Sequence, residues 1–308
     1  MIMKGGAMIV SSSFTEQQGL TFQKGLMRLQ IALEESFLEI GQMVTDQHVV
    51  ILIDRGLLDG SAYVSRSEWQ ALMDDLNMST VMMRDNRYDA VLHLVTAADG
   101  AQKFYASLSN EARYESIEEA VNKDKKLREA YMGHKNWVMI DNQFADFQSK
   151  INSAKQQVQR ILGRSGGTTF YKKFLLRKSS QRTMALSTVP INLPDGQHYE
   201  ESDVSETFIN FRTNEGKLLE ASIEKKGSNQ AFAYTLKLTI EKNKAQIHKK
   251  RSISASEFID LKTNKLPGML ELNCQRICTM EGELYMIIDY YPQVEDQPMI
   301  CVIQVDQN

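Results

Sequence analysis

An uninterrupted apolar run at residues 49–53, Val-Val-Ile-Leu-Ile, ends abruptly in Asp54, Arg55 and Gly56. Five consecutive apolar residues between polar ones are typical of a strand buried on both faces of a parallel sheet. Ligands of open α/β sheets bind beyond the carboxyl ends of such strands. We therefore expect Asp54 to hold a metal-bound water and Arg55 a phosphate. The chain nevertheless contains no G-x-x-x-x-G-K-[ST] loop to cradle phosphates. The run thus predicts a nucleotide-binding type of domain without its usual first strand and loop.

Composition narrows the class of protein. With 308 residues the chain is long enough for two domains. A net charge of -3 and a pI near 6.0 argue against a general nucleic-acid binder. The chain has three cysteines and no CxxC pair, and Cys274 and Cys278 have the even spacing that places both on one face of a strand. Because no signal peptide or apolar span is evident at the N-terminus, we predict a cytoplasmic protein.

Residues 1–162 alternate between helical and strand patterns. The sequence Ser13-Phe14-Thr15-Glu16 has the form of a capping box that opens a helix. Strands are expected at residues 49–53, 90–95 and 137–140. Helices are expected at about residues 100–108, 110–131 and 143–162. This alternation predicts an α/β domain with a parallel sheet.

A linker is expected at residues 163–167, Gly-Arg-Ser-Gly-Gly. Beyond it the sequence pattern changes from alternating helices and strands to mostly strands. Residues 168–308 carry eight strand-like runs separated by turn signals, with one helix that a second capping box opens at Ser254. The eight runs are residues 169–176, 204–211, 217–225, 232–241, 245–253, 269–280, 283–291 and 299–305. Successive strands with few crossovers predict an antiparallel β-barrel or a strongly curved sheet.

The first domain offers candidates for a phosphoryl site. Such a site needs a carboxylate near Mg²⁺ and cations around the phosphate. The carboxylate candidate and metal ligand is Asp54. The candidate cations are Arg55, Arg113 and Arg128. Asp141 and Asn142 form the polar end of a strand, and His134 is the residue expected to touch a base or ribose. The alternative is that polar strand ends and a charged helix are simply solvated.

Several spaced motifs resemble the TRPL translocation defect protein family. They are residues 54–59, 88–94, 110–115, 131–134 and 140–142, and the resemblance spans about residues 5–290. This family joins a P-loop NTPase (AAA-like) module, similar to that of nicotinamide-riboside kinases, to a CYTH-like β-barrel. The resemblance implies binding of GTP with Mg²⁺ and of anionic phospholipids such as phosphoinositides and phosphatidic acid. It also implies a role in endocytosis and membrane-protein trafficking, with protein cargo, peripherally on endosomal or plasma membranes.

The chain departs from that family at its start. The family's module begins with a strand and a Walker A loop upstream of the segment that matches residues 5–7. We therefore expect a truncated gene model or isoform in which the main β- and γ-phosphate contacts are missing. Losing several charge-assisted hydrogen bonds, each worth about 1.5–3 kcal/mol, predicts weak or absent nucleotide binding. A submicromolar dissociation constant for magnesium-GTP would contradict this.

The resemblance also implies a phosphate-binding set in the second domain, where CYTH-type barrels hold polyphosphates with inward-pointing charged residues. The basic candidates are Lys172, Lys173, Lys225, Lys226, Lys237, Lys249, Lys250, Arg251 and Arg276, and the carboxylate candidates are Glu206, Glu271 and Asp289. Residues 222–227 read Ser-Ile-Glu-Lys-Lys-Gly where the family carries arginines. A carboxylate repels phosphate, so we expect no triphosphatase activity.

The basic run at residues 248–251, His-Lys-Lys-Arg, has two open interpretations. It meets anionic lipid, where each basic residue adds about 1 kcal/mol, or it is a solvated strand end.

Three functions remain open at this point. We favour a non-catalytic adaptor that binds GTP and acidic phospholipids, with no catalytic residues. The alternative is an enzyme, a small-molecule kinase or nucleoside triphosphate hydrolase that uses Asp54 with Mg²⁺ and Arg113 as a lid cation. The third is a folding-impaired product, because a sheet without an interior strand exposes unpaired edges.

Overall fold

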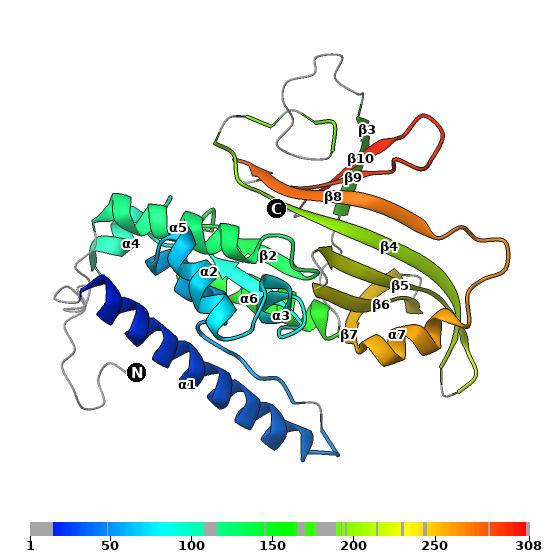
Figure 1. Ribbon diagram of the computed structural model, residues 1–308, viewed down its shortest axis with the longest axis horizontal. Helices are drawn as coiled ribbons and strands as arrows, with labels where there is room; N and C mark the ends of the chain where they lie inside the picture. Colours follow the sequence, from blue (N-terminus) through cyan, green and yellow to red (C-terminus); the bar gives the residue numbers. More distant parts are fainter. Residues whose placement is uncertain are drawn as a thin grey trace. The chain divides into compact units, whose positions relative to one another are not determined.

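The structure, a computed structural model, divides into two compact units, Met1–Met83 and Arg84–Asn308 (Figure 1). It describes residues 15–47, 49–107, 116–144, 146–164, 170–176, 189–191, 193–194, 196–213, 215–228, 231–242, 245–282 and 284–305. Each unit is presented by itself, and the predicted boundary at residues 163–167 stays a prediction.

Helices dominate the first unit. Its elements are α1 (Glu16–Gln42), η3 (Leu57–Tyr63), α2 (Arg66–Asp75) and α3 (Thr80–Arg84), the last of which ends at the first residue of the second unit. Helix α1 begins after Thr15, whose side chain and Gln18 form a reciprocal capping box. The box predicted at Ser13 is therefore wrong by two residues, because Thr15 also precedes a residue that can reach back to it. The buried apolar residues of this unit are Met27, Leu57, Leu58, Ala62, Trp69, Leu72, Met73 and Met83.

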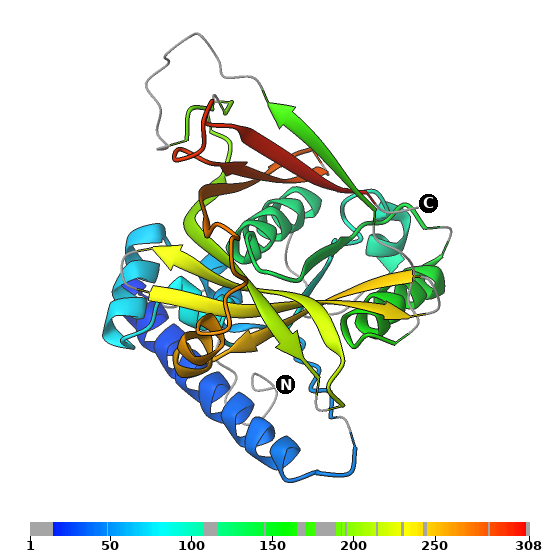
Figure 2. The same cartoon turned by 90° about the vertical axis from the view of Figure 1, so that its right-hand side faces the viewer.

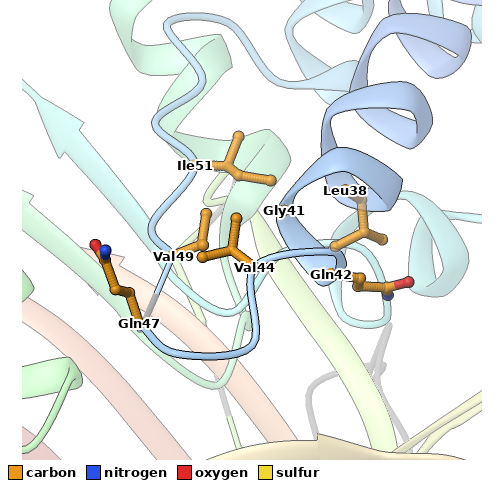
Figure 3. Close-up of a pocket in the computed structure, with 7 residues that line it drawn as sticks. All are labelled: Leu38, Gly41, Gln42, Val44, Gln47, Val49 and Ile51. Carbon is orange, nitrogen blue, oxygen red and sulfur yellow. The ribbon is translucent and has the colours of Figure 1, made fainter.

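The strand predicted at residues 49–53 is wrong. This segment has no strand pairing and stays exposed, with 81 % of Leu52 accessible to solvent. A single strand is stable only when neighbouring strands satisfy its backbone groups, and no described strand pairs with this segment. The segment lies instead beside the last turn of α1, where the two enclose a recess of ≈ 250 Å³ (Figure 3). The residues that line this recess are Leu38, Gly41, Gln42, Val44, Gln47, Val49 and Ile51.

The second unit opens with a small parallel sheet of two strands, β1 (Val91–Leu94) and β2 (Trp137–Ile140), which confirms two of the three predicted strands. The helices around it in the chain are α4 (Gln102–Ser107), α5 (Ile117–Tyr131) and α6 (Phe147–Ile161). Ser116 caps α5 in a reciprocal box with Glu119, and Asp146 caps α6. The helix predicted at residues 110–131 is thus confirmed from residue 117, and residues 108–115 lie outside the described part.

All eight strands predicted for the second half of the chain are present, and so is its helix. The strands are β3 (Phe170–Leu176), β4 (Tyr199–Arg212), β5 (Leu218–Ser228), β6 (Ala231–Lys242), β7 (Ala245–Ile253), β8 (Leu272–Glu281), β9 (Leu284–Tyr290) and β10 (Met299–Val305). The helix is α7 (Ala255–Lys262), whose N-cap Ser254 accepts a hydrogen bond from the Glu257 amide at 3.1 Å. These strands were predictable because apolar and polar residues alternate along them and glycine-containing turns separate them.

The eight strands form one antiparallel sheet in the order β3-β10-β9-β8-β4-β5-β6-β7. The predicted barrel is wrong, because closure requires the first and last strands to pair, and β3 pairs only with β10 and β7 only with β6. The sheet is strongly twisted instead. In Figure 2 the red strand β10 and the yellow strands of the other half run in clearly different directions.

The two faces of this sheet differ in chemistry. One face is apolar and carries two core clusters, one around Ile277 and Ile288 and the other around Ile223 and Leu236. Helix α7 packs on the second cluster through Phe258. Strand side chains alternate between faces, so the residues between these positions lie on the opposite face. That opposite face carries the charged residues described next.

No helix in the described part of the chain has the length and apolarity needed to cross a membrane.

Candidate functional site

One face of the eight-stranded sheet gathers charged side chains from six strands. We call it the charged face, and its members are Glu206, Glu224, Lys226, Lys237, Lys250, Arg276 and Asp289. The register brings them together, because directly paired residues share a face. Glu206 pairs with Glu224, Lys237 with Lys250, and Arg276 with Asp289. Four of the nine predicted basic residues therefore meet here, each from a different strand.

Glu224 is the centre of an ion-pair network and is only 3 % exposed. Lys237 lies with Nζ 2.7 Å from Glu224 and 3.0 Å from Glu206. Arg276 binds both carboxylate oxygens of Asp289, at 2.6 and 2.9 Å, and lies 3.3 Å from Glu224. Burial opposes the charge of Glu224, but Lys237 and Arg276 outweigh it and hold the pKa of this carboxyl below its usual range. These groups are therefore charged and mutually satisfied.

Lys250 is the exception on this face. Its Nζ donates to the carbonyl oxygen of Lys135 at 2.9 Å, and among the described residues no carboxylate lies within ion-pair distance of it. The side chain reaches solvent at the end of the sheet. Surrounding protein atoms that displace water, together with the charge of Lys237, nevertheless lower the pKa of Lys250 to about 8. Lys250 therefore lies near Lys237 and Arg276 on the same face, with a carbonyl oxygen rather than a carboxylate as its hydrogen-bond acceptor among the described residues.

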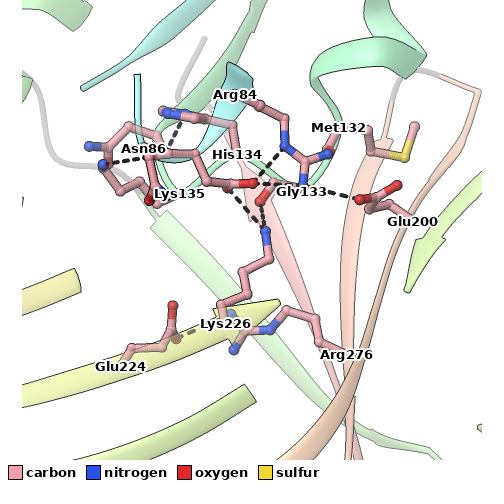
Figure 4. A network of polar contacts seen from close by, with 12 residues as sticks. Arg84, Asn86, Met132, Gly133, His134, Lys135, Glu200, Glu224, Lys226 and Arg276 are labelled. Atoms are coloured by element: carbon pink, nitrogen blue, oxygen red, sulfur yellow. Dashed lines mark hydrogen bonds and ion pairs between the residues drawn. The ribbon is translucent and has the colours of Figure 1, made fainter. Parts of the chain in front are cut away.

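Residues from the α/β part of the same unit close one end of the charged face (Figure 4). Lys226 forms an ion pair with Asp85 at 3.3 Å and donates to the carbonyl oxygen of Gly133. Arg84 is 2 % exposed and lies 2.8 Å from Asp85 and 3.1 Å from Glu200. The sequence interpretation missed Arg84 and Asp85, since nothing local to residues 84–85 indicates partners more than a hundred positions away.

His134 has a structural environment. It is buried, its Nε2 donates to the carbonyl oxygen of Tyr88 at 2.8 Å, and its Nδ1 accepts from the Asn136 amide at 3.1 Å. Burial lowers the pKa of His134 to about 4. The neutral ring therefore supports the fold, and both ring nitrogens are used within the protein.

A second polar cluster lies at the carboxyl ends of β1 and β2, where the sequence predicted a nucleotide site. Asp124 on α5 accepts from the Thr96 amide at 2.9 Å and from Arg128 at 2.9 Å, and it contacts His93 Nε2 at 3.2 Å. Burial opposes its charge, but the hydrogen bond from His93 and the other partners lower the pKa of Asp124. Arg128 also lies 3.8 Å from Asp99. The structure thus brings Arg128 to the predicted edge of the sheet.

The predicted strand end at Asp141 and Asn142 joins the same edge. Asn142 donates to the Thr96 carbonyl at 2.7 Å and accepts from Lys150 Nζ at 2.7 Å. Lys150 is buried and also donates to the Val95 carbonyl at 2.6 Å, and burial lowers its pKa. Asn142 therefore ties the loops after the two strands together, while Asp141 caps its own turn by accepting from the Gln143 amide.

The other predicted nucleotide residues are placed differently. Asp54 and Arg55 belong to the first unit, where Arg55 is largely exposed and lies 3.2 Å from Asp59. Arg113 lies outside the described residues. In the part of the chain that is described, no group of three His, Cys, Asp or Glu side chains is arranged to hold a metal ion.

The remaining basic candidates do not join the charged face, with one exception. Lys225 lies over the Phe232 ring, 3.8 Å from its centroid, on the other face. Lys249 and Arg251 flank Lys250 and so also point to the other face, where Arg251 pairs with Glu257. Lys172 and Lys173 are both exposed on edge strand β3, and the register places only Lys173 on the side of the charged face.

The carboxylate candidate Glu271 lies apart from the charged face, paired with Lys262 of α7 at 2.9 Å. A further recess of ≈ 390 Å³ involves β4, β5, β6 and β8. Its lining is Asp203, Val204, Ser205, Lys225, Phe232, Asn273, Cys274, Gln275, Pro292 and Gln293.

One family model matches the first part of the chain. Residues 6–150 match the family model of an AAA domain, a P-loop NTPase domain. No curated protein matches the chain. Among solved structures, the hypothetical protein NE1496 is similar at 14% sequence identity, over 46% of this chain and 78% of that one, with a TM-score of 0.29.

Proposed function

We propose that the charged face binds the phosphate of an anionic phospholipid headgroup, in a non-catalytic protein that acts in membrane-protein trafficking and endocytosis. The observation that carries this proposal is the convergence of Lys226, Lys237, Lys250 and Arg276 on one face, where no described carboxylate lies within ion-pair distance of Lys250. Headgroups of phosphoinositides and phosphatidic acid offer the acceptor oxygens that such a set of donors requires.

Electrostatics support the proposal. The charge of Lys237 and the loss of water around Lys250 disfavour its ammonium form. An arriving phosphate would reverse that effect by supplying the counter-charge. Ser202, which pairs with Arg276 in the register, is buried, and its Oγ has no hydrogen-bond partner among the described residues. A hydroxyl in that position is a further donor for a phosphate oxygen.

Vesicle sedimentation tests the lipid proposal. We expect the chain to bind phosphatidylcholine vesicles that contain phosphatidic acid or a phosphoinositide, and to bind pure phosphatidylcholine weakly. Lys250→Glu should remove this binding, because the charge reversal replaces a cationic donor of the charged face with a carboxylate that repels phosphate. Lys249→Glu is the matched control, since it makes the same change one residue away on the opposite face. Equal binding by the two variants would contradict the proposal.

We propose guanine-nucleotide binding with Mg²⁺ as a second function of the AAA domain. The match over residues 6–150 supports it, and so does Arg128 beside Asp99 and Asp124, whose buried Nε has no partner in the part of the chain that the structure describes. The missing G-x-x-x-x-G-K-[ST] loop predicts that the affinity is low. Thermal unfolding with magnesium-GTP, and with ATP as control, measures it.

The enzyme alternative has a separate test. A small-molecule kinase or triphosphate hydrolase that uses Asp54 would turn over ATP or GTP, and Asp54→Ala would abolish the turnover. Lipid binding that persists in Asp54→Ala supports the adaptor.

A further inference from the structure

Three of the four consecutive residues 132–135 (Met-Gly-His-Lys) supply backbone acceptors to cations at the end of the charged face. The Met132 carbonyl accepts from Arg84, and the Gly133 carbonyl accepts from Lys226. The Lys135 carbonyl accepts from Lys250 Nζ at 2.9 Å. Figure 4 shows the first two of these carbonyl-bearing residues beside Arg84 and Lys226. Three cationic side chains are thus satisfied by carbonyl oxygens of one short segment.

The segment is held closely against the sheet. Gly133 has φ +86°, and a Cβ there would lie 3.2 Å from Glu200 Cγ and 3.4 Å from Lys226 Nζ. The Gly133 amide donates to the Tyr285 hydroxyl at 3.2 Å. This close approach therefore depends on the absence of a side chain at residue 133.

A carbonyl oxygen is a weaker acceptor for a cation than a phosphate oxygen, because it carries only a partial charge. Lys226 and Lys250 must release some of these hydrogen bonds before their ammonium groups can donate to a headgroup. The geometry points to an autoinhibitory role: segment 132–135 is an internal competitor that occupies Lys226 and Lys250 until an anionic headgroup displaces it. This regulation rests on the lipid-binding function proposed above.

The elements next to the segment in the chain favour a role in regulating lipid binding. Met132 directly follows α5, which carries Asp124 and Arg128, and β2 begins two residues after Lys135. Both flanking elements therefore reach the candidate nucleotide edge: β2 ends there, and α5 places Asp124 and Arg128 there. A movement of α5 would be transmitted to the carbonyl oxygens that hold Lys226 and Lys250.

Gly133→Ala in the full chain tests the inference. The added methyl group and the positive φ should push the segment away from the sheet, free Lys250, leave Lys226 with its Asp85 ion pair but without the Gly133 carbonyl, and raise the affinity for phosphatidylcholine vesicles containing phosphatidic acid by about fivefold or more. Gly216→Ala is the matched control. Its φ is +81°, but a Cβ there meets nothing within 4 Å, so it reproduces the backbone strain without moving the segment.

Tyr285→Phe is a second variant that keeps the test valid if Gly133→Ala unfolds. It removes the hydroxyl that accepts from the Gly133 amide and also hydrogen-bonds Cys278, and it retains the ring that packs on Trp137, 4.8 Å between centroids. We expect a smaller increase in affinity in the same direction. Unchanged or lower affinity in Tyr285→Phe and in folded Gly133→Ala would overturn the inference. If Lys250→Glu still abolishes binding in that case, the lipid function stands and only the competition fails.

Discussion

Lys226 and Asp85 form an ion pair across 141 residues of sequence, with Nζ 3.3 Å from Oδ1 and with side chains only 8 % and 3 % exposed. The pair links strand β5 to the residue that follows α3. Burial opposes the charge of Asp85, but Lys226 and Arg84 together lower the pKa of this carboxyl. One end of the charged face is therefore held by buried, mutually neutralising charges, whereas Lys250 has only a carbonyl partner.

Removal of Arg276 should destabilise the protein strongly. Arg276→Met leaves the buried carboxylate of Asp289 without its bidentate partner and leaves Glu224 paired with Lys237 but not with Arg276, and breaking a buried pair costs about 3–5 kcal/mol. Arg251→Met is the control, because its pair with Glu257 is exposed and worth at most about 1 kcal/mol. Urea unfolding of the two variants measures the difference. Equal losses would show that the pairs on the charged face contribute no more than a surface pair.

Stability should fall as the pH drops from about 6.5 to about 4. The folded pKa of His134 is about 4 and its usual value is 6.5, so the unfolded chain binds the extra proton in this interval. The stabilisation that comes from neutral His134 is fully present above pH 6.5 and is lost as the pH falls to the folded pKa. The free energy of unfolding decreases by about 3 kcal/mol over this interval. The free energy of unfolding at pH 7 and pH 5 checks this. His134→Gln should lose that slope, and a wild-type slope in the variant would assign it to other groups.

Shortening the side chain of Leu52 should have almost no effect on stability. Leu52 is 81 % exposed, so Leu52→Ala should change the free energy of unfolding by no more than about 0.5 kcal/mol. Ile140→Ala, at a residue 3 % exposed on β2, should cost about 2–5 kcal/mol. A comparable loss at Leu52 would mean that residues 49–53 form a buried strand after all.

The three cysteines should resist alkylation in the native protein. Cys274, Cys278 and Cys301 are free and buried, and burial raises the pKa of each thiol, to about 12 at Cys274. Since the thiolate is the reactive form, iodoacetamide at pH 8 should leave all three unmodified until denaturant is added. Mass spectrometry of the intact protein measures how many cysteines are alkylated. Rapid native labelling of Cys274 would contradict the buried placement.

Much of the β-rich half was predictable from local pattern. Period-two alternation and glycine turns located all eight strands, and the even spacing of Cys274 and Cys278 correctly placed both on one face. The same alternation could have separated Lys225 from Lys226 and Lys249 from Lys250, because adjacent strand residues point to opposite faces. Arg128 and Asn142 lie at the edge of the parallel sheet where the nucleotide site is predicted, and their role there stays a prediction.

Other features had no local signal. Residues 49–53 are as apolar as a buried strand, yet a strand forms only where neighbours accept its backbone hydrogen bonds. Closure of the sheet into a barrel depends on whether β3 and β7 meet, which the composition of neither strand determines.

The sequence by itself determined where the strands of the second half lie and which residues of each strand share a face, because both follow from the local geometry of an extended chain. Only the tertiary structure decided which opposite charges meet, as Lys226 meets Asp85 and Arg84 meets Glu200. Such pairs join residues more than a hundred positions apart. Their contact depends on how the sheet and the α/β elements pack, and on the requirement that buried charges find partners, which no local sequence pattern encodes.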